Sequence, residues 1–235
     1  MNLKFGTGGL RAIMGEGPDC LNIETIREAT MGVADYIKKR TKQPKIAICY
    51  DSRINSREFA KETARVLAAK GCQVLISETL MPTPFLSYVI RNSYCDLGVC
   101  ITASHNGKEY NGYKVYWSDG AQITSPVDKE IIAEVNKVKD YSLIRRITLE
   151  EAKKQKLYIE VGSALDKLYF EELEKLSINK DIIKNFEVKE TKSALGGTRK
   201  QVVDKQGEKY ELKEVFEAYT RFGGMPIIAD VGFDQ

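Results

Sequence analysis

The chain has 235 residues, of which 43% are hydrophobic and 29% are charged, which is ordinary for a globular protein with one large or two smaller domains. Its 36 basic and 33 acidic residues give a net charge of +3, and so even a balance argues against nucleic acid or an anionic membrane as a partner. The amino terminus lacks an apolar signal core, and no uninterrupted apolar run approaches membrane-spanning length.

The five cysteines are scattered along the chain and are mostly flanked by apolar residues. None of them forms a C-x-x-C pair. This pattern is typical of reduced thiols that pack as small hydrophobic side chains. The expected location is therefore the cytoplasm, where thiols stay reduced.

Residues 5–17 form a glycine-rich stretch. Glycines let backbone N–H groups approach a phosphate closely, but the lysine spacing of a P-loop is missing and no strand precedes the stretch, so it is not a nucleotide motif. Arg11 is its interesting member, because a guanidinium can hold phosphate oxygens in a bidentate way. The alternative for the whole stretch is a flexible turn.

A helix is predicted over roughly residues 23–40. Asn22 is a suitable N-cap and Glu24 suits the positive first turn. Its buried face is formed by apolar residues at helical spacing, namely Ile26, Ala29, Val33 and Ile37. The basic residues 38–40 at its end are interpreted as a solvated terminus that complements the helix dipole.

Residues 45–101 alternate strand, helix, strand, helix, strand. The strands are nearly continuous apolar runs, and the helices are introduced by a possible capping box and by a proline turn; the predicted elements are 45–50, a helix after Asn55-x-x-Glu58 that Gly71 stops, 73–77, 81–92 and 97–101. Such alternation indicates an α/β fold with a mostly parallel mixed sheet sandwiched by helices.

A polar loop, Thr102-Ala103-Ser104-His105-Asn106-Gly107, follows the third strand. Ligands bind at the carboxyl ends of strands in such sheets, so this loop is a candidate binding site. From these residues alone Ser104 is more simply interpreted as a turn serine, and a phosphoryl carrier is the alternative that a family resemblance would favour. A serine hydrolase is not indicated, because the G-x-S-x-G elbow is absent and the only histidine, His105, is adjacent to the serine. His105 also lacks histidine or cysteine partners for a metal site.

The chain after the loop is predicted more coarsely. Residues 113–117 alternate like an edge strand, which would allow Lys114 to face solvent, and Thr148-x-x-Glu151 can cap a short helix. Further predictions are a helix over 126–138, helices near 164–177 and 211–221, a loop at Gly196-Gly197-Thr198-Arg199, and a strand over 226–231. Asp51 and Arg53 are expected to form a strand-end turn that supports the serine loop.

Five ordered blocks of this sequence resemble the first domain of the α-D-phosphohexomutases, the phosphoglucomutase and phosphomannomutase family. The serine block is the most specific, reading T-A-S-H-N-G-K-E-Y-N-G-Y-K-V-Y over 102–116. The blocks are residues 5–17, 51–53, 81–84, 102–107 and 110–116. The resemblance covers residues 3–138, extends over 155–183 as the opening of the family's second domain, and ends near residue 184.

The resemblance implies that a phosphoserine donates its phosphoryl group to a hexose 1- or 6-phosphate and regains a phosphoryl group from the bisphosphate intermediate. By motif position Ser104 would be the phosphoserine and would reach Mg²⁺ through its phosphate. Arg11 would hold phosphate oxygens, while His105 and Lys114 would line the site and assist proton movement. The implied cofactors are Mg²⁺ and hexose 1,6-bisphosphate as activator, and the implied partner is a small-molecule hexose phosphate, with glucose favoured.

The chain departs from the family pattern in two ways. Gly107 stands where the family loop usually has proline, which leaves the turn less stiff. The D-x-D-x-D metal loop of the second domain and the later sugar and phosphate loops are absent from the sequence, and Mg²⁺ needs such oxygen ligands. We therefore expect a fragment or truncated chain without mutase turnover of its own.

The expected domains are 1–140 with the serine loop, a linker at 141–162, and a partial or divergent second domain at 163–235. The alternative function is a non-catalytic phosphoprotein or interaction module derived from a mutase amino-terminal domain. Sugar preference and oligomeric state cannot be read from these residues.

Overall fold

The structure is a computed structural model that describes residues 5–6, 9–138, 143–176, 186–192, 198–204 and 209–211. The chain divides into two compact units, Met1–Tyr169 and Phe170–Gln235. The serine loop and all the predicted site residues belong to the first unit.

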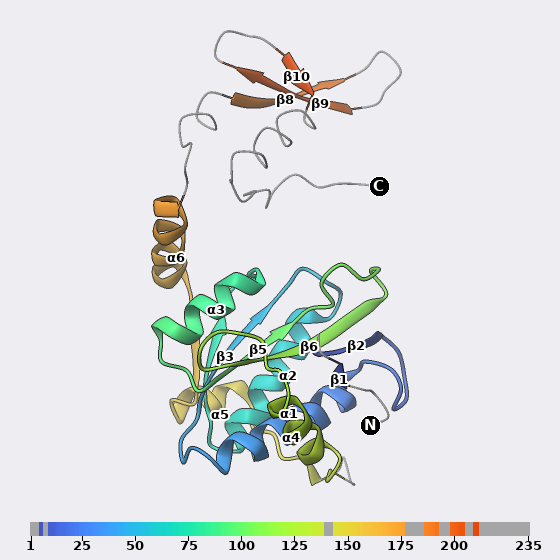
Figure 1. Cartoon of the computed structure of the whole chain (residues 1–235), viewed down its shortest axis with the longest axis vertical. Helices are drawn as coiled ribbons and strands as arrows, with labels where there is room; N and C mark the ends of the chain where they lie inside the picture. The colour runs from blue at the N-terminus through green and yellow to red at the C-terminus, as the bar shows by residue number, and fades with distance from the viewer. Residues whose placement is uncertain are drawn as a thin grey trace. The chain divides into compact units, whose positions relative to one another are not determined.

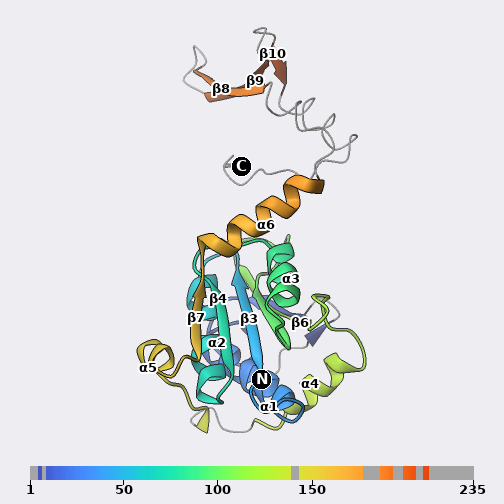
Figure 2. The same ribbon diagram turned by 90° about the vertical axis from the view of Figure 1, so that its left-hand side faces the viewer.

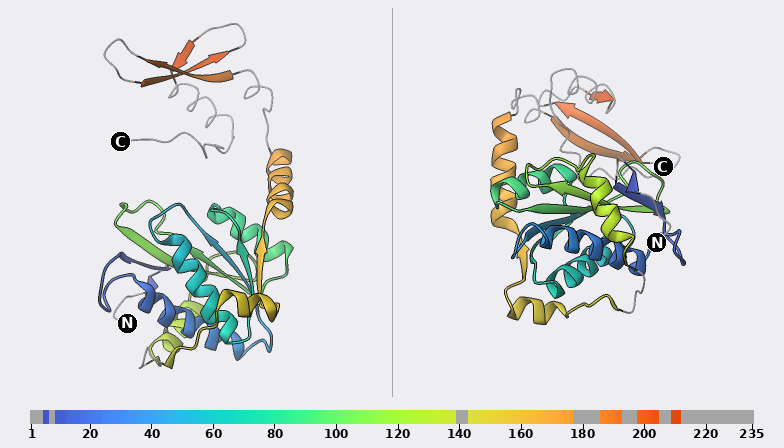
Figure 3. Two further views of the ribbon diagram at one scale, coloured as in Figure 1. Left: turned by 180° about the vertical axis from the view of Figure 1, so that it is seen from behind. Right: turned by 60° about the horizontal axis from the view of Figure 1, so that its bottom comes forward.

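The first unit is built on a seven-stranded mixed sheet with the strand order β1-β2-β6-β5-β3-β4-β7 (Figure 1). The strands β5, β3, β4 and β7 are parallel, whereas β6 is antiparallel to both β5 and β2. The bounds are β1 Phe5–Gly6, β2 Gly9–Ile13, β3 Lys45–Tyr50, β4 Gln73–Ser77, β5 Leu97–Ile101, β6 Tyr110–Trp117 and β7 Tyr158–Val161. Figure 3 shows from behind that β7 lies at the opposite edge of the sheet from β1 and β2.

Helices cover both faces of this sheet. One face is covered by α1, α2, α4 and α5, and the other by α3, as the views in Figures 1 and 2 agree. Their bounds are α1 Ile23–Lys38, α2 Ser56–Ala69, α3 Thr83–Asn92, α4 Val127–Val135, α5 Leu149–Lys154 and α6 Ser163–Leu176. The predicted α/β fold, a mostly parallel mixed sheet sandwiched by helices, is confirmed.

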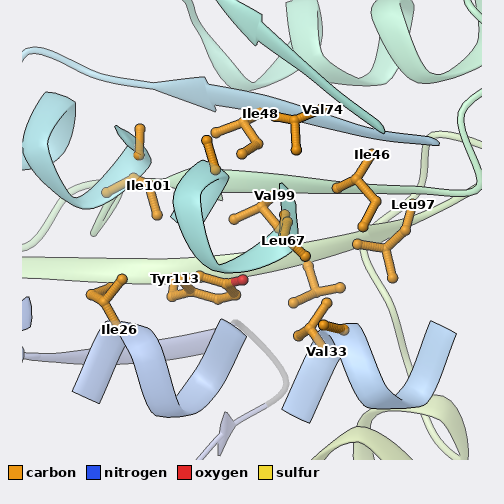
Figure 4. Close-up of a cluster of buried hydrophobic side chains, with 14 of the residues drawn as sticks. Ile26, Val33, Ile46, Ile48, Leu67, Val74, Leu97, Val99, Ile101 and Tyr113 are labelled. Atoms are coloured by element: carbon orange, nitrogen blue, oxygen red, sulfur yellow. The ribbon is translucent and has the colours of Figure 1, made fainter. Parts of the chain in front are cut away.

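The core lies between the sheet and α1 and α2. Figure 4 shows Ile46 and Ile48 from β3 and Val99 from β5 packed with Leu67 of α2. On the α1 side, Ile26 and Val33 point toward the sheet, where Tyr113 of β6 is completely buried. The strands are buried on both faces, which explains their nearly continuous apolar sequence.

The predicted caps are only partly confirmed. The Asn22 side chain accepts from the N–H groups of Glu24 and Thr25, and Thr25 completes a capping box, so the first helix begins as predicted. The prediction of a capping box at Asn55 is wrong. Asn55 has a left-handed backbone (φ +63°) instead of the extended backbone typical of an N-cap, and its side chain makes no cap hydrogen bond.

The prediction that residues 113–117 form an edge strand is also wrong. β6 lies between β5 and β2, and its residues from Asn111 to Tyr116 are buried. The alternating pattern of residues 113–117 suggested an edge strand, but the glycine-rich stretch forms β2 at Gly9–Ile13. β2 pairs with β6 on the side away from β5, so β6 is an interior strand of the sheet. Consequently, the polar side chains of β6 are interior groups.

The stretch 141–162, predicted as a linker, contains α5 and β7. Thr148 Oγ1 accepts from the Glu151 N–H at 3.1 Å, which confirms the predicted cap. β7 pairs with β4 in the main sheet. The division of the chain into domains at 1–140, 141–162 and 163–235 stays a prediction.

The described part of the second unit is an antiparallel sheet of order β10-β9-β8, with bounds Phe186–Lys192, Thr198–Asp204 and Lys209–Glu211 for β8, β9 and β10. The prediction of a loop at Thr198 and Arg199 is wrong, because both begin β9. Gly196, Gly197, the predicted strand over 226–231 and, apart from Glu211, the predicted helix over 211–221 lie outside the described residues.

All five cysteines are free thiols, and all except the half-buried Cys20 are buried. This confirms their prediction as small hydrophobic side chains. Among the helices that the structure describes, none is both long enough and apolar enough to cross a membrane.

The close contact between α1 and α4 gives a test of the fold. A Cβ placed on Gly32 would lie 2.6 Å from the backbone N and 2.7 Å from the Cα of Val135. Backbone cannot yield as a side chain can, so we expect Gly32→Ala to lower the free energy of unfolding by about 1–3 kcal/mol, measured by urea denaturation.

Glu24→Ala is the control on the same helix, because Glu24 is exposed, and its effect should stay within about 0.5 kcal/mol. If α4 did not pack here, Gly32→Ala would instead stabilise the protein by about 1 kcal/mol through helix propensity. That result would contradict the packing of α4 on α1.

Candidate functional site

The serine loop joins the carboxyl end of β5 to the start of β6. Ser104 is exposed in this loop, and its backbone is left-handed with φ +61°. The Ser104 N–H donates to Thr102 Oγ1 at 2.9 Å, which stabilises the turn locally. A non-glycine residue in this conformation costs free energy and is common at functional sites. Ser104 is therefore held at the tip of a defined turn.

Arg53 lies in the turn after β3, and its guanidinium forms hydrogen bonds with the backbone of the serine loop. Its side chain donates to the carbonyl oxygens of Ser104, Asn106, Gly107 and Tyr110 at 2.8, 2.6, 2.8 and 3.1 Å. Asp51 Oδ2 lies 3.3 Å from Arg53 Nε. The prediction that Asp51 and Arg53 support the serine loop is confirmed by these contacts.

Arg11 lies on β2, in register with Gly112 of β6. Its Nη1 donates to Asn106 Oδ1 at 3.2 Å, so it reaches the serine loop. Its Nε is buried and has no hydrogen-bond partner among the described residues. A buried guanidinium N–H without an acceptor is costly, and an anion bound at the loop would supply that acceptor.

Lys114 lies on β6 and is only 7% exposed. It is in register with Cys100 of β5, the strand that leads into the serine loop. The pKa of its ammonium is lowered, first because burial penalises the charged form and second because Arg11 is nearby. The alternative of a solvent-facing lysine is therefore wrong.

His105 is exposed in the same loop, next to Ser104. The structure therefore brings the four predicted residues into one region in different ways. Ser104 and His105 share the loop, Arg11 contacts the loop, and Lys114 is buried in the strand that follows it.

A buried polar network beneath the loop was not predicted. Ser56 Oγ donates to Asp51 Oδ1 at 2.7 Å, and Asn111 Nδ2 donates to Ser56 Oγ at 2.9 Å. Asn111 is fully buried and also donates to the carbonyl of Ile54. An asparagine inside an apolar strand pattern was the available signal, since such a side chain must find partners when buried.

Gly112 lets the strands approach closely at the base of the site. A Cβ at this position would lie 2.5 Å from the carbonyl oxygen of Thr102 and 2.7 Å from that of Leu10. The first is a backbone atom of the serine loop and the second a backbone atom of β2, so a side chain has no room. The glycine thus fixes the distance between the strand that carries Arg11 and the loop that carries Ser104.

The described residues do not provide a Mg²⁺ site by themselves. No group of three or more histidine, cysteine, aspartate or glutamate side chains gathers anywhere in the part of the chain that the structure describes. Asp51 is already engaged by Arg53 and Ser56, and Glu109, whose carboxylate oxygens would lie 2.5 and 2.6 Å from a Cβ on Gly107, is a second carboxylate at the loop. A phosphate on Ser104 would add oxygen ligands, but further carboxylates would have to come from elsewhere.

A family profile described as "Phosphoglucomutase/phosphomannomutase, alpha/beta/alpha domain I" matches residues 2–142. The phosphoglucomutase of Staphylococcus haemolyticus is 42% identical over 134 residues, which cover 57% of this chain and 24% of that protein. The glucose 1,6-bisphosphate synthase of Mus musculus is 45% identical over 139 residues, which cover 55% of this chain and 22% of that protein.

Among solved structures, the exocytosis-sensitive phosphoprotein parafusin (phosphoglucomutase) from Paramecium, in its open form, superposes with a TM-score of 0.61 at 22% identity. The match covers 77% of this chain and 36% of that one. The chain therefore spans about a quarter to a third of the proteins that it resembles. At this identity the structural match supports the fold only.

The lowered pKa of Lys114 gives a test of the site. Between that value and the ordinary lysine pKa of about 10.4, the unfolded chain binds more protons than the folded chain, so stability rises with pH in this window. We expect Lys114→Met to be at least as stable as the parent at neutral pH, because the buried charge is removed. As the pH rises through the pKa of Lys114 in the folded protein, the free energy of unfolding of the parent should increase relative to that of the variant.

Urea denaturation across this pH range measures the difference. Lys108→Met is the control, because Lys108 is an exposed loop lysine and its replacement should leave the pH dependence unchanged. A loss of stability in Lys114→Met at neutral pH would mean that the charge is favourably solvated or paired.

Proposed function

Because the chain belongs to the phosphoglucomutase/phosphomannomutase family, we propose that it carries the phosphoserine domain of a phosphohexomutase. In this proposal Ser104 accepts and donates the phosphoryl group that interconverts hexose 1-phosphate and hexose 6-phosphate through a bisphosphate intermediate. One observation carries the proposal: an exposed serine stands on a firmly held loop beside a buried arginine N–H that lacks an acceptor and a buried lysine.

The proposed phosphoryl transfer would use the arginine, the lysine and the serine of this site. Phosphoryl transfer depends mainly on positioning and on stabilising the charge of the equatorial oxygens. Arg11 would hold those oxygens, and the bond from phosphorus to Ser104 Oγ would break as the sugar hydroxyl oxygen bonds to phosphorus. The hydroxyl proton must leave, and a lysine whose pKa is lowered, such as Lys114, is unprotonated more often and is therefore more available as the proton acceptor.

The exposed His105 would line the entrance to the same site. Mg²⁺, the cofactor that the family relationship indicates, would neutralise charge on the transferring group when bound. Of the described residues, a phosphorylated Ser104 would be its contact. The activator would be a hexose 1,6-bisphosphate, since this molecule can charge the serine.

The remaining parts of the proposal follow from the family. The partner is a small-molecule hexose phosphate rather than nucleic acid or a membrane, and the location is the cytoplasm. The serine domain would occupy residues 1–140, with a linker at 141–162 and a partial second domain at 163–235. Since the chain matches only 24% of the phosphoglucomutase relative, catalytic turnover would need residues that are not in this chain.

The second candidate is a non-catalytic phosphoprotein or interaction module that kept the mutase domain. The lack of a carboxylate cluster among the described residues favours it. Both candidates share a phosphorylated Ser104, but only the mutase returns the phosphoryl group to a sugar phosphate.

The first test is phosphoryl transfer to the chain. Incubation with glucose 1,6-bisphosphate and Mg²⁺ should add one phosphoryl group, detected by intact-protein mass spectrometry and located by peptide mapping. Ser104→Ala should abolish the addition, because no other serine lies in this turn. Ser118→Ala, which changes another exposed turn serine, should leave it unchanged. Equal labelling of parent and Ser104→Ala would refute the proposal.

The second test is turnover. A coupled assay on glucose 1-phosphate with Mg²⁺ and a trace of the 1,6-bisphosphate should show little or no product from this chain, because the carboxylate and sugar-binding loops are missing. Turnover that disappears in Ser104→Ala would show that the chain is a complete mutase and that its carboxyl-terminal part supplies the metal ligands.

A further inference from the structure

Both terminal nitrogens of the Arg53 guanidinium donate two hydrogen bonds each. Nη1 donates to the carbonyls of Gly107 and Tyr110, Nη2 donates to those of Ser104 and Asn106, and Nε faces Asp51 Oδ2. An arginine side chain has five N–H groups in a fixed plane. Four of them donate to carbonyls and the fifth, on Nε, faces the Asp51 carboxylate in an ion pair, so the loop backbone is arranged around one planar cation.

The anchoring of Arg53 makes the arrangement rigid. Its own N–H donates to Asp51 Oδ1 at 3.0 Å, and its side chain is 14% exposed. Asp51 is held in turn by Ser56 at the start of α2. The guanidinium is thus held in place by residues after β3 and at the start of α2, independently of its contacts with the loop.

The carbonyl contacts dictate where the loop N–H groups point. A trans peptide is planar, and its C=O and N–H bonds point in opposite directions. Since the carbonyls of Ser104, Asn106 and Gly107 point at Arg53, the following N–H groups point away from it. These are the N–H groups of His105, Gly107 and Lys108, and no hydrogen bond among the described residues uses them.

Two other N–H groups of the loop are already satisfied. The Ser104 N–H donates to Thr102 Oγ1, and the Asn106 N–H donates to the Ala103 carbonyl at 3.2 Å. The unused donors are therefore those whose peptides Arg53 orients. Backbone N–H groups left free on the side of the loop away from Arg53 are available to an anion.

We propose that Arg53 is a positioning residue, and that by drawing the loop carbonyls to one side it directs the N–H groups of His105, Gly107 and Lys108 toward a phosphoryl group on Ser104. This inference rests on the proposed function of Ser104. Gly107 has a particular place in it: the proline usual at this position in the family has no N–H, so this chain has one donor more.

A lysine cannot replace Arg53 in this role. It has three donors on one atom instead of five in a plane, and it cannot reach four carbonyls and a carboxylate together. Charge alone would be conserved in Arg53→Lys, while the orientation of the loop peptides would be lost. This variant separates positioning from a general electrostatic effect.

The experiment measures the rate at which glucose 1,6-bisphosphate transfers a phosphoryl group to Ser104 in the full chain, by intact-protein mass spectrometry. We expect Arg53→Ala and Arg53→Lys to slow the transfer by up to about 100-fold, the loss that a misplacement of about 1 Å can cause. Low concentrations of guanidinium chloride should restore much of the rate in Arg53→Ala. A parent rate in Arg53→Lys, or in Arg53→Ala without guanidinium, would overturn the inference.

Arg40→Ala is the matched control. Arg40 also contacts a carbonyl, that of Tyr36, and a carboxylate, that of Glu130, but it has no contact with the serine loop. Its loss should leave the transfer rate unchanged. Thermal unfolding of all variants shows whether a slow rate reflects a chain that fails to fold.

A measurement on the parent protein keeps the inference testable if the Arg53 variants do not fold. In ¹H–¹⁵N spectra, phosphorylation of Ser104 should shift the amide signals of His105, Gly107 and Lys108 more than that of Asn106, whose N–H is already bonded to the Ala103 carbonyl. If Ser104 is phosphorylated and these three signals stay in place, Arg53 does not direct them to the phosphate.

The failure of the proposed function would look different. A parent chain that is not phosphorylated at Ser104 would refute that function. Titration of the same chain with inorganic phosphate, followed by ¹H–¹⁵N spectra, would then test the role of Arg53 separately. Chemical-shift changes at the amides of His105, Gly107 and Lys108 in the parent, absent in Arg53→Lys, would support an anion site made by Arg53. No change at these amides in the parent would overturn the inference.

Discussion

A single guanidinium beneath a loop is the constraint on which the candidate site depends. Arg53 accounts for the conformation of the serine loop because it donates to three carbonyl oxygens of that loop and to that of Tyr110, the first residue of β6. Parallel pairing of β3 with β5 makes this possible, since it places the turn after β3 next to the loop after β5. The sheet register, set by buried apolar residues, therefore decides where Ser104 stands.

The second element is positive charge held in an apolar setting. Lys114 and the partly buried Arg11 lie on adjacent strands, where burial and then the like charge of Arg11 lower the pKa of the lysine and disfavour its ionised form. This arrangement costs stability in the absence of an anion. A phosphate would satisfy the unpartnered Arg11 N–H and offset the repulsion, so the site is organised for an anionic group before that group arrives.

Much of this was predictable from the sequence. Residues 45–101 gave the correct alternation of strands and helices, because apolar runs and turn residues act locally. The contacts of Arg53 could be anticipated only as support for the loop, since they depend on strand order. The burial of Lys114 was missed, because β2 is contributed by a glycine-rich stretch far away in the chain. Asn55 failed as a cap through its left-handed backbone, and β8 to β10 lie in polar sequence without strand periodicity.

The most direct test of this account is the second pKa of the phosphate on Ser104, followed by ³¹P NMR in the phosphorylated chain. A free phosphoserine has a second pKa of about 6. Contact with Arg11, Lys114 and the loop N–H groups favours the dianion, so the account predicts a value clearly below this in the folded protein and a return to it in urea. An unshifted value in the folded protein would contradict the account, because the phosphoryl group would then stand in solvent away from the cations.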